Sequence, residues 1–319
     1  MYNAELKNKY INQYTSNQST KSVCRTVFDA FEKHELEWGA DLCTRSDEEL
    51  QPIIDKIMGF RERSKWMRLI ILKDYVKWCI VNNVDGACDG MLRITQVGLE
   101  KVRIQTVPNP RKLQEYLNAI CHPEEMKTTD NIYRCYYWLA YAGMDEEDIF
   151  NVKISDVNFD DMTVNYSRKA THVPIYREAI KAFKNCVELD RFLYLHPNYD
   201  RDDTWKERVD GDTLIRGVDS PITLLSMRSG LSRRSKKMEN NTPLRLSYYR
   251  VWISGIFYRM REDEVNSGAD VDFSDIVADL MEGKTYKLDT GRNTIAAKQR
   301  QLERDYEIDY QRWKLAWKL

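Results

Sequence analysis

Apolar residues recur at helical spacing in three stretches of the first third of the chain. These stretches cover residues 20–34, 46–60 and 61–83. Apolar side chains at positions i, i+3 and i+4 form one face of an α-helix, and that face is buried when it packs against another element. The pattern therefore predicts a small all-helical domain over residues 1–105.

The second of these helices carries a start signal. Ser46 stands three residues before Glu49. This is the spacing of a capping box, in which each side chain binds the backbone N–H of the other residue. We therefore expect a helix to start at this point.

Residues 94–112 contain Gly98, Pro108 and Pro110 and show little helical pattern. Because glycine and proline interrupt regular structure, this segment is typical of a linker. A second domain is therefore predicted over residues 106–319.

Two short stretches of the second domain predict a β-hairpin. Residues 162–166 and 171–176 alternate in polarity, and residues 167–170 join them. Helical patterns occupy residues 109–120, 131–143, 144–157, 177–195, 245–262 and 296–318, and a polar, loop-rich insert ends near Leu224. The predicted fold class is mainly α with a small β-sheet or hairpin.

Composition agrees with a soluble protein of two domains. The chain has 319 residues, of which 42% are hydrophobic and 31% charged, and its mean hydropathy is -0.62. This length exceeds what one hydrophobic core usually organises. No stretch approaches the roughly 18 apolar residues of a membrane span, so we expect a cytoplasmic protein.

Cysteine and histidine residues give no sign of a metal or a cofactor. The seven cysteines are Cys24, Cys43, Cys79, Cys88, Cys121, Cys135 and Cys186, and the four histidines are His34, His122, His172 and His196. None of the cysteines forms a C-x-x-C pair, and no two histidines stand at i, i+4. We expect reduced thiols, no metal site and no cofactor.

Charge is distributed unevenly although the net charge is only -1. Between Met227 and Arg261 there are nine basic residues and a single acid, Glu239. Residues 263–282 contain acids and no base. Such asymmetry allows one face to meet a polyanion such as DNA while another keeps the protein in solution.

The order of elements resembles the tyrosine-recombinase (phage integrase) family across nearly the whole chain. The clearest local match is LAYAGMDEEDIFNVKISDVNFDDMTV, residues 139–164, which resembles the family's helix, glycine turn, second helix and first strand. The resemblance implies a helical core-binding domain followed by a catalytic-like α+β domain. In that family the two domains form a C-shaped clamp around duplex DNA.

The resemblance also shows which catalytic residues have changed. Recombinase chemistry needs a tyrosine nucleophile, two arginines that stabilise negative charge, and a lysine that protonates the leaving oxygen. The lysine is matched by Lys169 and the second arginine by Arg250, but Asp145 stands where the first arginine belongs and Asp148 replaces a glutamate. A carboxylate about 4 Å from a phosphate costs on the order of a few kcal/mol, which opposes catalysis.

Further positions of the motif depart from the family. Ser247 replaces the histidine three residues before Arg250, and Lys284 matches a later histidine. No tyrosine stands at the nucleophile position, since Tyr286 comes too early and Tyr306 too late. Lys169 and Arg250 remain, and they can hold a phosphate but cannot cleave the strand. The resemblance therefore implies that the chain has no working catalytic site and is not an enzyme.

A DNA clamp that cannot cleave is suited to occupying a promoter. The pattern is similar to that of the recombinase-like master repressors of SP-beta-type prophages, which govern the choice between lysis and lysogeny. This similarity implies a transcriptional repressor in the cytoplasm, on the host nucleoid. Its partners would be double-stranded operator DNA and an anti-repressor or peptide-linked regulator that releases it.

The basic residues expected to contact DNA fall into an N-terminal and a C-terminal group. They are Arg61, Arg63, Lys65 and Arg68 in the third helix, and Lys169, Arg233, Arg234, Lys236, Lys237, Arg245 and Arg250 in the second domain. The four basic residues between 233 and 237 are expected to lie in a loop. Replacing these four residues by alanine is expected to weaken DNA binding and to flatten its salt dependence. The alternative for each group is a solvated charged face.

Function and assembly each allow more than one interpretation. The chain could be a divergent active recombinase that uses Tyr286 or Tyr306, or an interaction protein that has lost DNA binding. Arg250 could pair internally with Asp145. The C-terminal helix has an amphipathic stripe of Tyr310, Trp313 and Trp317, which could dock onto a second subunit or pack within its own chain.

Overall fold

The structure is a computed structural model that describes the chain except residues 58–60, 96, 196–202, 238–243, 245 and 283–294. The described residues divide into two compact units. Unit 1 contains Met1–Arg103 and Asp272–Leu319, and unit 2 contains Ile104–Val271. The first boundary thus falls close to residue 105, and the C-terminal segment groups with unit 1.

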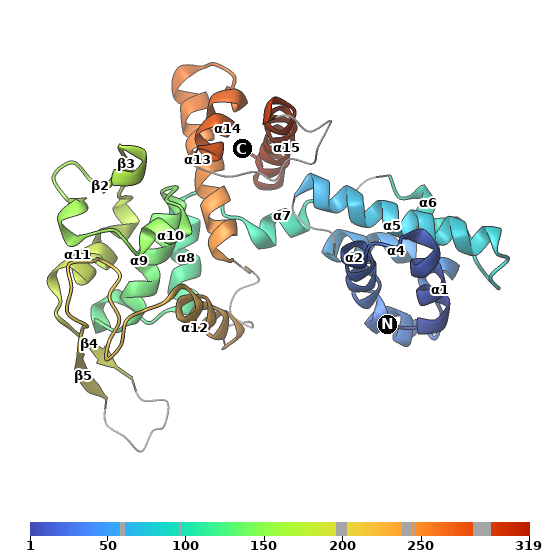
Figure 1. Ribbon diagram of the computed structural model, residues 1–319, viewed down its shortest axis with the longest axis horizontal. Coiled ribbons are helices and arrows are strands. Elements are labelled where there is room, and N and C mark those ends of the chain that lie inside the picture. Colours follow the sequence, from blue (N-terminus) through green and yellow to red (C-terminus); the bar gives the residue numbers. More distant parts are fainter. Residues whose placement is uncertain (58–60, 96, 196–202, 238–243, 245, 283–294) are drawn as a thin grey trace. The chain divides into compact units, whose positions relative to one another are not determined.

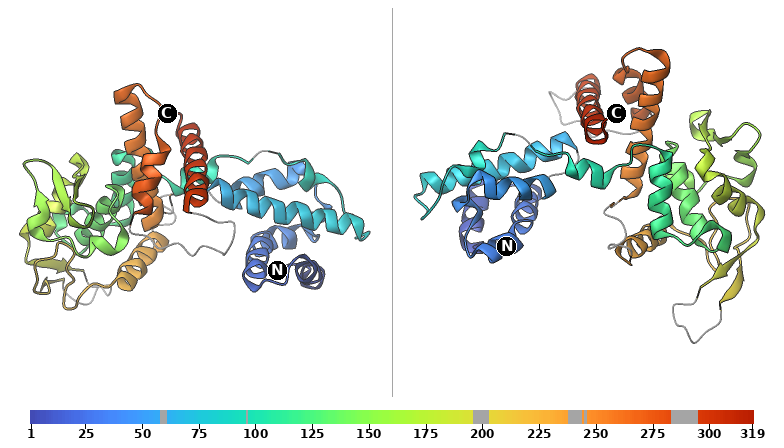
Figure 2. Two further views of the ribbon diagram at one scale, coloured as in Figure 1. Left: turned by 45° about the horizontal axis from the view of Figure 1, so that its top comes forward. Right: turned by 180° about the vertical axis from the view of Figure 1, so that it is seen from behind.

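Unit 1 starts as a bundle of helices around one long helix. Its first elements are α1 (Ala4–Tyr14), α2 (Gln18–Asp29), α3 (Glu32–Trp38), η1 (Leu42–Thr44), α4 (Asp47–Ile57), α5 (Glu62–Val81) and α6 (Gly90–Arg93), followed by α7 (Glu100–Gln105), whose last two residues belong to unit 2. Helices α1, α2 and α4 gather on one side of α5 (Figures 1 and 2). Their apolar faces form one core, in which Phe28, Leu72 and Tyr75 are fully buried.

Two expectations for this bundle are wrong in detail. The helix expected over residues 20–34 is split into α2 and α3, which allows Glu35 of α3 to reach the buried Lys7 of α1. The expected linker contains α7, because Val102 is buried and gives this short helix a packed face. In both places tertiary contacts decide the local structure.

The predicted capping box is confirmed. The backbone N–H of Ser46 donates to Glu49 Oε2 at 3.1 Å, and the N–H of Glu49 donates to Ser46 Oγ at 3.4 Å. Both groups would otherwise lack a partner at the start of α4.

Unit 1 ends with α14 (Phe273–Met281) and α15 (Ile295–Trp317), which pack against each other. Tyr310 and Trp313 of α15 are fully buried, and the ring of Tyr310 lies 6.0 Å from that of Phe273. The aromatic stripe therefore packs within its own chain at Tyr310 and Trp313.

Unit 2 is organised around a buried helix. Its elements are α8 (Pro110–Ile120), η2 (Glu124–Met126), α9 (Asp130–Tyr141), α10 (Glu146–Ile149), η3 (Ile154–Asp156), β1 (Val157–Asn158), β2 (Thr163–Tyr166), η4 (Ser167–Lys169), β3 (Thr171–Pro174), η5 (Arg177–Ala179), α11 (Ile180–Glu188), β4 (Arg191–Tyr194), β5 (Thr204–Glu207), α12 (Leu224–Lys237) and α13 (Tyr248–Ser267). Helix α9 packs between α11 and α13. A Cβ at Gly255 of α13 would lie 1.8 Å from the carbonyl oxygen of Tyr141, so only glycine permits this approach.

The predicted hairpin and fold class are confirmed. Strands β2 and β3 are antiparallel, with Val164 opposite Val173, and β1 adds a third strand in the order β1-β2-β3. The turn between β2 and β3 contains η4, and Ala170 after it has φ 48°. The protein is mainly helical with two small sheets.

Two further expectations for unit 2 are corrected. The end of the expected helix 177–195 is β4, which pairs with β5 from the loop-rich insert and buries Phe192, and this ribbon projects from the unit (Figure 2). The basic segment 233–237 is not a loop but the end of α12. The helix forms because Met227 and Leu231, one turn apart, are both buried.

All seven cysteines are free thiols, and six of them are buried. Among the described residues there is no group of three or more potential metal ligands. No described helix combines the length and the apolar character that crossing a membrane requires.

Candidate nucleic-acid interface

The hairpin turn carries Arg168 between two carboxylates. Arg168 forms an ion pair with Asp145, and its Nε lies 2.9 Å from Asp148 Oδ2. The hydroxyl of Tyr166 donates to the same oxygen of Asp148 at 2.6 Å and accepts from the N–H of Asp145 at 3.3 Å. Burial, and then this bond to Asp148, raise the pKa of Tyr166. Asp145, Asp148, Tyr166 and Arg168 therefore form one network, which we call the turn cluster.

The backbone that presents Asp145 depends on a glycine. Gly143 follows α9 with φ 104°, a left-handed conformation that favours glycine, and a Cβ there would lie 2.5 Å from Arg259 Nη2. Arg259 Nη1 donates to the carbonyl oxygen of Tyr141 at 2.7 Å and so fixes the end of α9. Asp145 is then the N-cap residue of α10, where the helix dipole favours an anion. The glycine turn of the family motif is present, but an acidic residue follows it.

Asp145 is paired with Arg168 and not with Arg250, the partner that the sequence had left open. Lys169 lies beside Arg168 in the turn, half-buried, at the position expected from the family motif. Sequence reasoning singled out Lys169 and overlooked Arg168. The available signal was the presence of two acids at Asp145 and Asp148, which need a cation when they are brought together.

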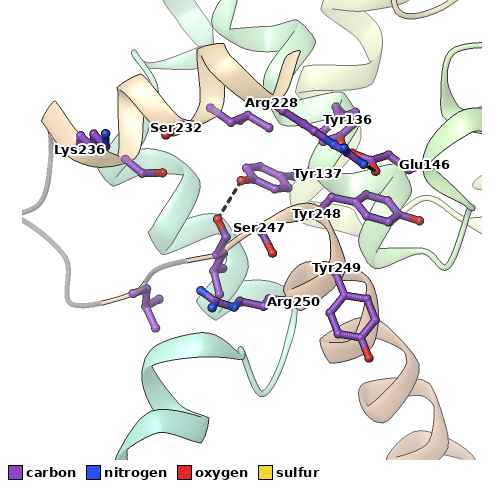
Figure 3. A pocket seen from close by; sticks show the side chains of 14 residues that line it. Tyr136, Tyr137, Glu146, Arg228, Ser232, Lys236, Ser247, Tyr248, Tyr249 and Arg250 are labelled. Carbon is purple, nitrogen blue, oxygen red and sulfur yellow. Dashed lines mark hydrogen bonds and ion pairs between the residues drawn. The ribbon is translucent and has the colours of Figure 1, made fainter. Parts of the chain in front are cut away.

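A cavity of about 540 Å³ opens between α9, α12 and the start of α13 (Figure 3). Ser247 is the N-cap residue of α13, and Arg250 stands in its first turn; both line the cavity. The hydroxyl of Tyr137 donates to the carbonyl oxygen of Leu246 at 3.2 Å and holds the chain before α13. Lys236 reaches the same cavity from α12 (Figure 3). Two predicted phosphate-binding residues thus face one cavity.

Another cation of the cavity wall is already paired. Arg228 of α12 contacts both carboxylate oxygens of Glu146, and the hydroxyl of Tyr136 also donates to this carboxylate. Burial alone would raise the pKa of Glu146, but Arg228 and Tyr136 hold it below its ordinary value. Arg228 is therefore bound to α10 and joins α12 to the rest of the unit.

The basic residues of α12 have different environments. Arg233 and Lys236 are exposed, and within the described part of the chain neither has an ion-pair partner. Arg234 is largely buried, with Nη2 2.5 Å and Nε 2.8 Å from Asp130 Oδ1. Neighbouring arginines in the sequence therefore differ in what they can bind. The side chain of Lys237 lies outside the described residues.

Asp130 is the centre of a buried polar network. Besides Arg234, it binds the backbone N–H of His122 at 2.8 Å and His122 Nδ1 at 2.7 Å. The guanidinium of Arg234 also lies 3.8 Å from the ring centre of Tyr133. Burial would raise the pKa of Asp130, but Arg234 and His122 lower it below its ordinary value. The prediction that Arg234 contacts DNA does not fit this structural role.

The cations at the start of α5 are also engaged within unit 1. Arg61 Nε lies 2.6 Å from Asp309 Oδ2, and the guanidinium lies 4.8 Å from the ring centre of Tyr306. Arg63 Nη1 lies 3.9 Å from Asp305 Oδ2. Two of the four basic residues that were expected to contact DNA from this helix thus form ion pairs with α15.

The remaining two cations of that group have local contacts. Lys65 is buried, with Nζ 5.1 Å from the ring centre of Trp66. Arg68 Nη1 donates to the carbonyl oxygen of Ile57 at 2.8 Å. Arg68 therefore connects α5 to α4, and Lys65 packs on a ring of its own helix, so the expected basic face of α5 is largely a set of structural contacts.

Several predicted positions lie outside the described residues. They are Arg245, Lys284 and Tyr286. Tyr306, the other tyrosine considered as a nucleophile, is buried against Arg61 in unit 1.

The comparisons with known proteins identify the class of the N-terminal part. Residues 1–81 match a family model for a core-binding domain, which confirms that expectation for about a quarter of the chain. The family is described as MrpR, N-terminal core-binding domain. No curated protein matches the chain by sequence.

Two solved structures similar to the chain are integrases. The Tn1549 transposon integrase (residues 82–397) in complex with circular intermediate DNA is 12% identical, with 93% of this chain and 98% of that chain covered and a TM-score of 0.34. A lambda integrase (residues 75–356) dimer bound to a COC' core site is also 12% identical, with 92% and 100% covered and a TM-score of 0.34. At these TM-scores we draw no conclusion from the likeness.

Proposed function

We propose that this chain is a sequence-specific DNA-binding repressor on a tyrosine-recombinase scaffold that has lost strand cleavage. The match of residues 1–81 to a core-binding domain supports DNA binding. The sequence resemblance supports the scaffold of the second part. The loss of cleavage is supported by the chemistry of the turn cluster.

The turn cluster is the observation that carries the proposal. Strand cleavage adds negative charge to a phosphate, and enzymes stabilise that charge with fixed cations. Asp145 at the position of the family's first arginine and Asp148 at the position of a glutamate share one cation, Arg168. Two carboxylates and one guanidinium leave a net negative charge, which opposes a phosphate that is gaining charge. Binding of an intact phosphate nearby needs less cationic stabilisation than strand cleavage, because the phosphate gains no further negative charge.

We assign phosphate binding to four cations of unit 2. Arg250 and Lys236 line the cavity, Arg233 is exposed on α12, and Lys169 lies in the hairpin turn. Such contacts give affinity and salt dependence, whereas base edges in the grooves give specificity. We assign specificity to the core-binding unit.

The biological role follows from the same proposal. A protein that occupies a promoter without cutting it acts as a repressor, and the resemblance to SP-beta-type master repressors points to control of lysis and lysogeny on the host nucleoid. An anti-repressor or a peptide-linked regulator would release it from the operator. No cofactor takes part.

The proposal is tested by immunoprecipitation of the tagged protein across its host genome, followed by gel shift on the best site. We expect discrete promoter sites and a shift that unlabelled specific DNA removes much more efficiently than unrelated DNA. No enrichment, or equal competition by both DNAs, would refute sequence-specific repression.

A double replacement of Arg233 and Lys236 by alanine is expected to weaken DNA binding and to lower its salt slope. Each phosphate contact contributes about 0.9 to the slope of log affinity against log salt, so two contacts lower it by roughly 1.8. Fluorescence anisotropy between low and moderate salt measures this. Lys181→Ala on α11 is the matched control, and equal slopes for all three proteins would remove α12 from the interface.

Replacing Arg168 by alanine is expected to reduce DNA affinity about tenfold with little loss of stability. Arg168 is half-exposed, so its ion pairs contribute at most about 1 kcal/mol to folding. Without it, Asp145 and Asp148 repel the phosphates near Lys169. The triple variant with Asp145→Asn and Asp148→Asn added should regain the affinity. If it binds as weakly as the single variant, Arg168 contacts DNA itself.

A further inference from the structure

A second pocket of unit 2 lies between the start of α9, strand β4 and the end of α12, and we call it the β4 pocket. Its volume is about 520 Å³. It shares no lining residue with the cavity of Figure 3. Pockets of this size hold small organic molecules in many proteins.

The charges that line the β4 pocket favour an anion. Arg233 is exposed, and Asp130 is the one acid among the described residues of the lining. Both oxygens of Asp130 are already occupied, Oδ1 by the guanidinium of Arg234 and Oδ2 by His122. Because Arg234 balances the charge of Asp130, the charge of Arg233 is left to attract a ligand.

His122 supplies a second polar group. Its Nδ1 lies 2.7 Å from Asp130 Oδ2, and its side chain is 50% exposed. A carboxylate only accepts hydrogen bonds, so the proton of the ring stays on Nδ1 and Nε2 lies on the side turned away from Asp130. No other described residue binds Nε2. This nitrogen accepts a hydrogen bond when the ring is neutral and donates one when it is protonated.

Strand β4 and helix α9 give the pocket an apolar and aromatic part. Leu193 is half-buried, Tyr194 is 36% exposed, and the ring of Tyr133 lines the pocket from α9. The pocket therefore combines a cation and an imidazole with rings and an apolar side chain. An inorganic ion would use only the polar groups, whereas an organic anion would use both parts.

We propose that the β4 pocket binds a small organic phosphate, namely a phosphomonoester on an aromatic or apolar body. The phosphate lies at Arg233 and His122, and the hydroxyl of Thr129 is a further donor for it in the lining. The body of the ligand packs against Leu193 and Tyr194.

The chemistry of His122 selects a phosphomonoester among the possible anions. A phosphomonoester has a second pKa of about 6, so near neutral pH it can keep or lose one proton. With that proton it donates to a neutral Nε2, and without it the phosphate accepts from the protonated ring. A carboxylate and a DNA phosphodiester are ionised at this pH and have no proton to give. A phosphomonoester can therefore bind His122 in either state of the ring.

This inference stands apart from DNA binding but shares Arg233 with it. The arginine cannot hold a DNA phosphate and the ligand at once, so the ligand should weaken DNA binding, a consequence that rests on the proposed function. The binding itself is measured without DNA. Its failure would leave the proposed function standing.

The test is isothermal titration calorimetry of the full chain with phenyl phosphate, inorganic phosphate and benzoate at one ionic strength. We expect phenyl phosphate to bind at one site. It should bind at least about tenfold more tightly than inorganic phosphate, which lacks the ring. It should also bind at least about tenfold more tightly than benzoate, which has the ring but carries a carboxylate.

Variants locate the binding in the β4 pocket. Arg233→Ala should weaken phenyl phosphate binding at least about tenfold, and His122→Asn, which keeps an N–H for Asp130 but removes Nε2, about fivefold. Lys236→Ala is the matched comparison, because Lys236 is an exposed cation of the same helix outside this pocket. It should weaken DNA binding but not phenyl phosphate binding. Circular dichroism melts verify that each variant is folded.

Four results would each overturn the proposed site. They are no saturable binding of phenyl phosphate, benzoate that binds as tightly, binding that Arg233→Ala leaves unchanged, and an equal loss in Lys236→Ala. If Arg233→Ala and His122→Asn lose DNA affinity while the unaltered protein binds no phenyl phosphate, the pocket belongs to the DNA interface instead.

Discussion

Arg234→Ala is expected to destabilise unit 2 by about 3–5 kcal/mol, because it leaves the buried carboxylate of Asp130 without its cation. Asp130 is 3% exposed, and among the described residues only His122 remains to bind its carboxylate after the substitution. The contact of the guanidinium with the ring of Tyr133 is lost as well. For a unit of this size such a loss lowers the melting temperature by roughly 6–20 °C.

The matched control for this prediction is the preceding residue. Arg233 is exposed and has no ion-pair partner in the described chain, so Arg233→Ala should change stability by less than about 0.5 kcal/mol. Differential scanning calorimetry of both variants provides the comparison. If Arg234→Ala melts like Arg233→Ala but loses DNA binding, then Arg234 belongs to the interface after all.

Lys7→Met should destabilise unit 1 by a similar amount, about 3–5 kcal/mol. Lys7 and Glu35 are both fully buried, and Lys7 Nζ lies 2.5 Å from each carboxylate oxygen of Glu35. Methionine keeps much of the apolar volume but leaves Glu35 uncompensated. The double variant Lys7→Met/Glu35→Gln removes the charge of Glu35 and keeps an acceptor for the N–H of Leu42, so it should recover much of the loss. Asp41, 3.7 Å from Lys7 Nζ, keeps its charge in both variants.

The loss should also depend on pH. Burial raises the pKa of Glu35 above its ordinary value, although Lys7 opposes the shift. Between the unfolded and the folded pKa the folded state binds more protons, so stability falls as pH rises. Removing Lys7 raises the pKa of Glu35 in the folded state further, and so widens the pH range over which stability falls. The destabilisation by Lys7→Met should therefore be smaller at about pH 5 than at about pH 8, and urea unfolding at the two pH values measures it.

Local signals in the sequence were sufficient to predict several elements of the fold. The capping box of Ser46 and Glu49 depends on residues three apart, and the hairpin of β2 and β3 on a few residues around its turn. The turn at Gly143 needs only a glycine after a helix. In each case the forces act between neighbours in the chain, so the pattern of residue types was informative.

The elements and contacts that the sequence did not predict depend on residues that are far apart in the chain. Helix α1 was not predicted because its sequence is polar. Its Lys7 is nevertheless buried, and it is paired there with Glu35, which lies 28 residues away in the sequence. Strand β4 was expected to be helical, but its pairing with β5 comes from the insert. Whether a cation is free cannot be seen from its neighbours, since Arg234 and Asp130 are 104 residues apart.

Contacts with distant residues matter most for the candidate interface. A basic sequence predicts a basic surface only if its charges have no partner in the fold. Arg61, Arg63 and Arg234 meet carboxylates of other elements, whereas Arg233 and Lys236 remain exposed. The resemblance to recombinases located the altered catalytic positions, and the structure adds that Arg168 has become the partner of the acids there.

The most direct test of binding without cleavage uses a nicked suicide substrate that contains the best operator site. A recombinase that cleaves such DNA becomes trapped as a covalent complex through its tyrosine. The substrate is labelled, incubated with the protein and analysed both by gel shift and after denaturation with detergent. We expect a shifted complex in the native gel and no labelled protein after denaturation. A labelled adduct that survives denaturation would show that the chain is an active recombinase and would contradict the proposed loss of strand cleavage.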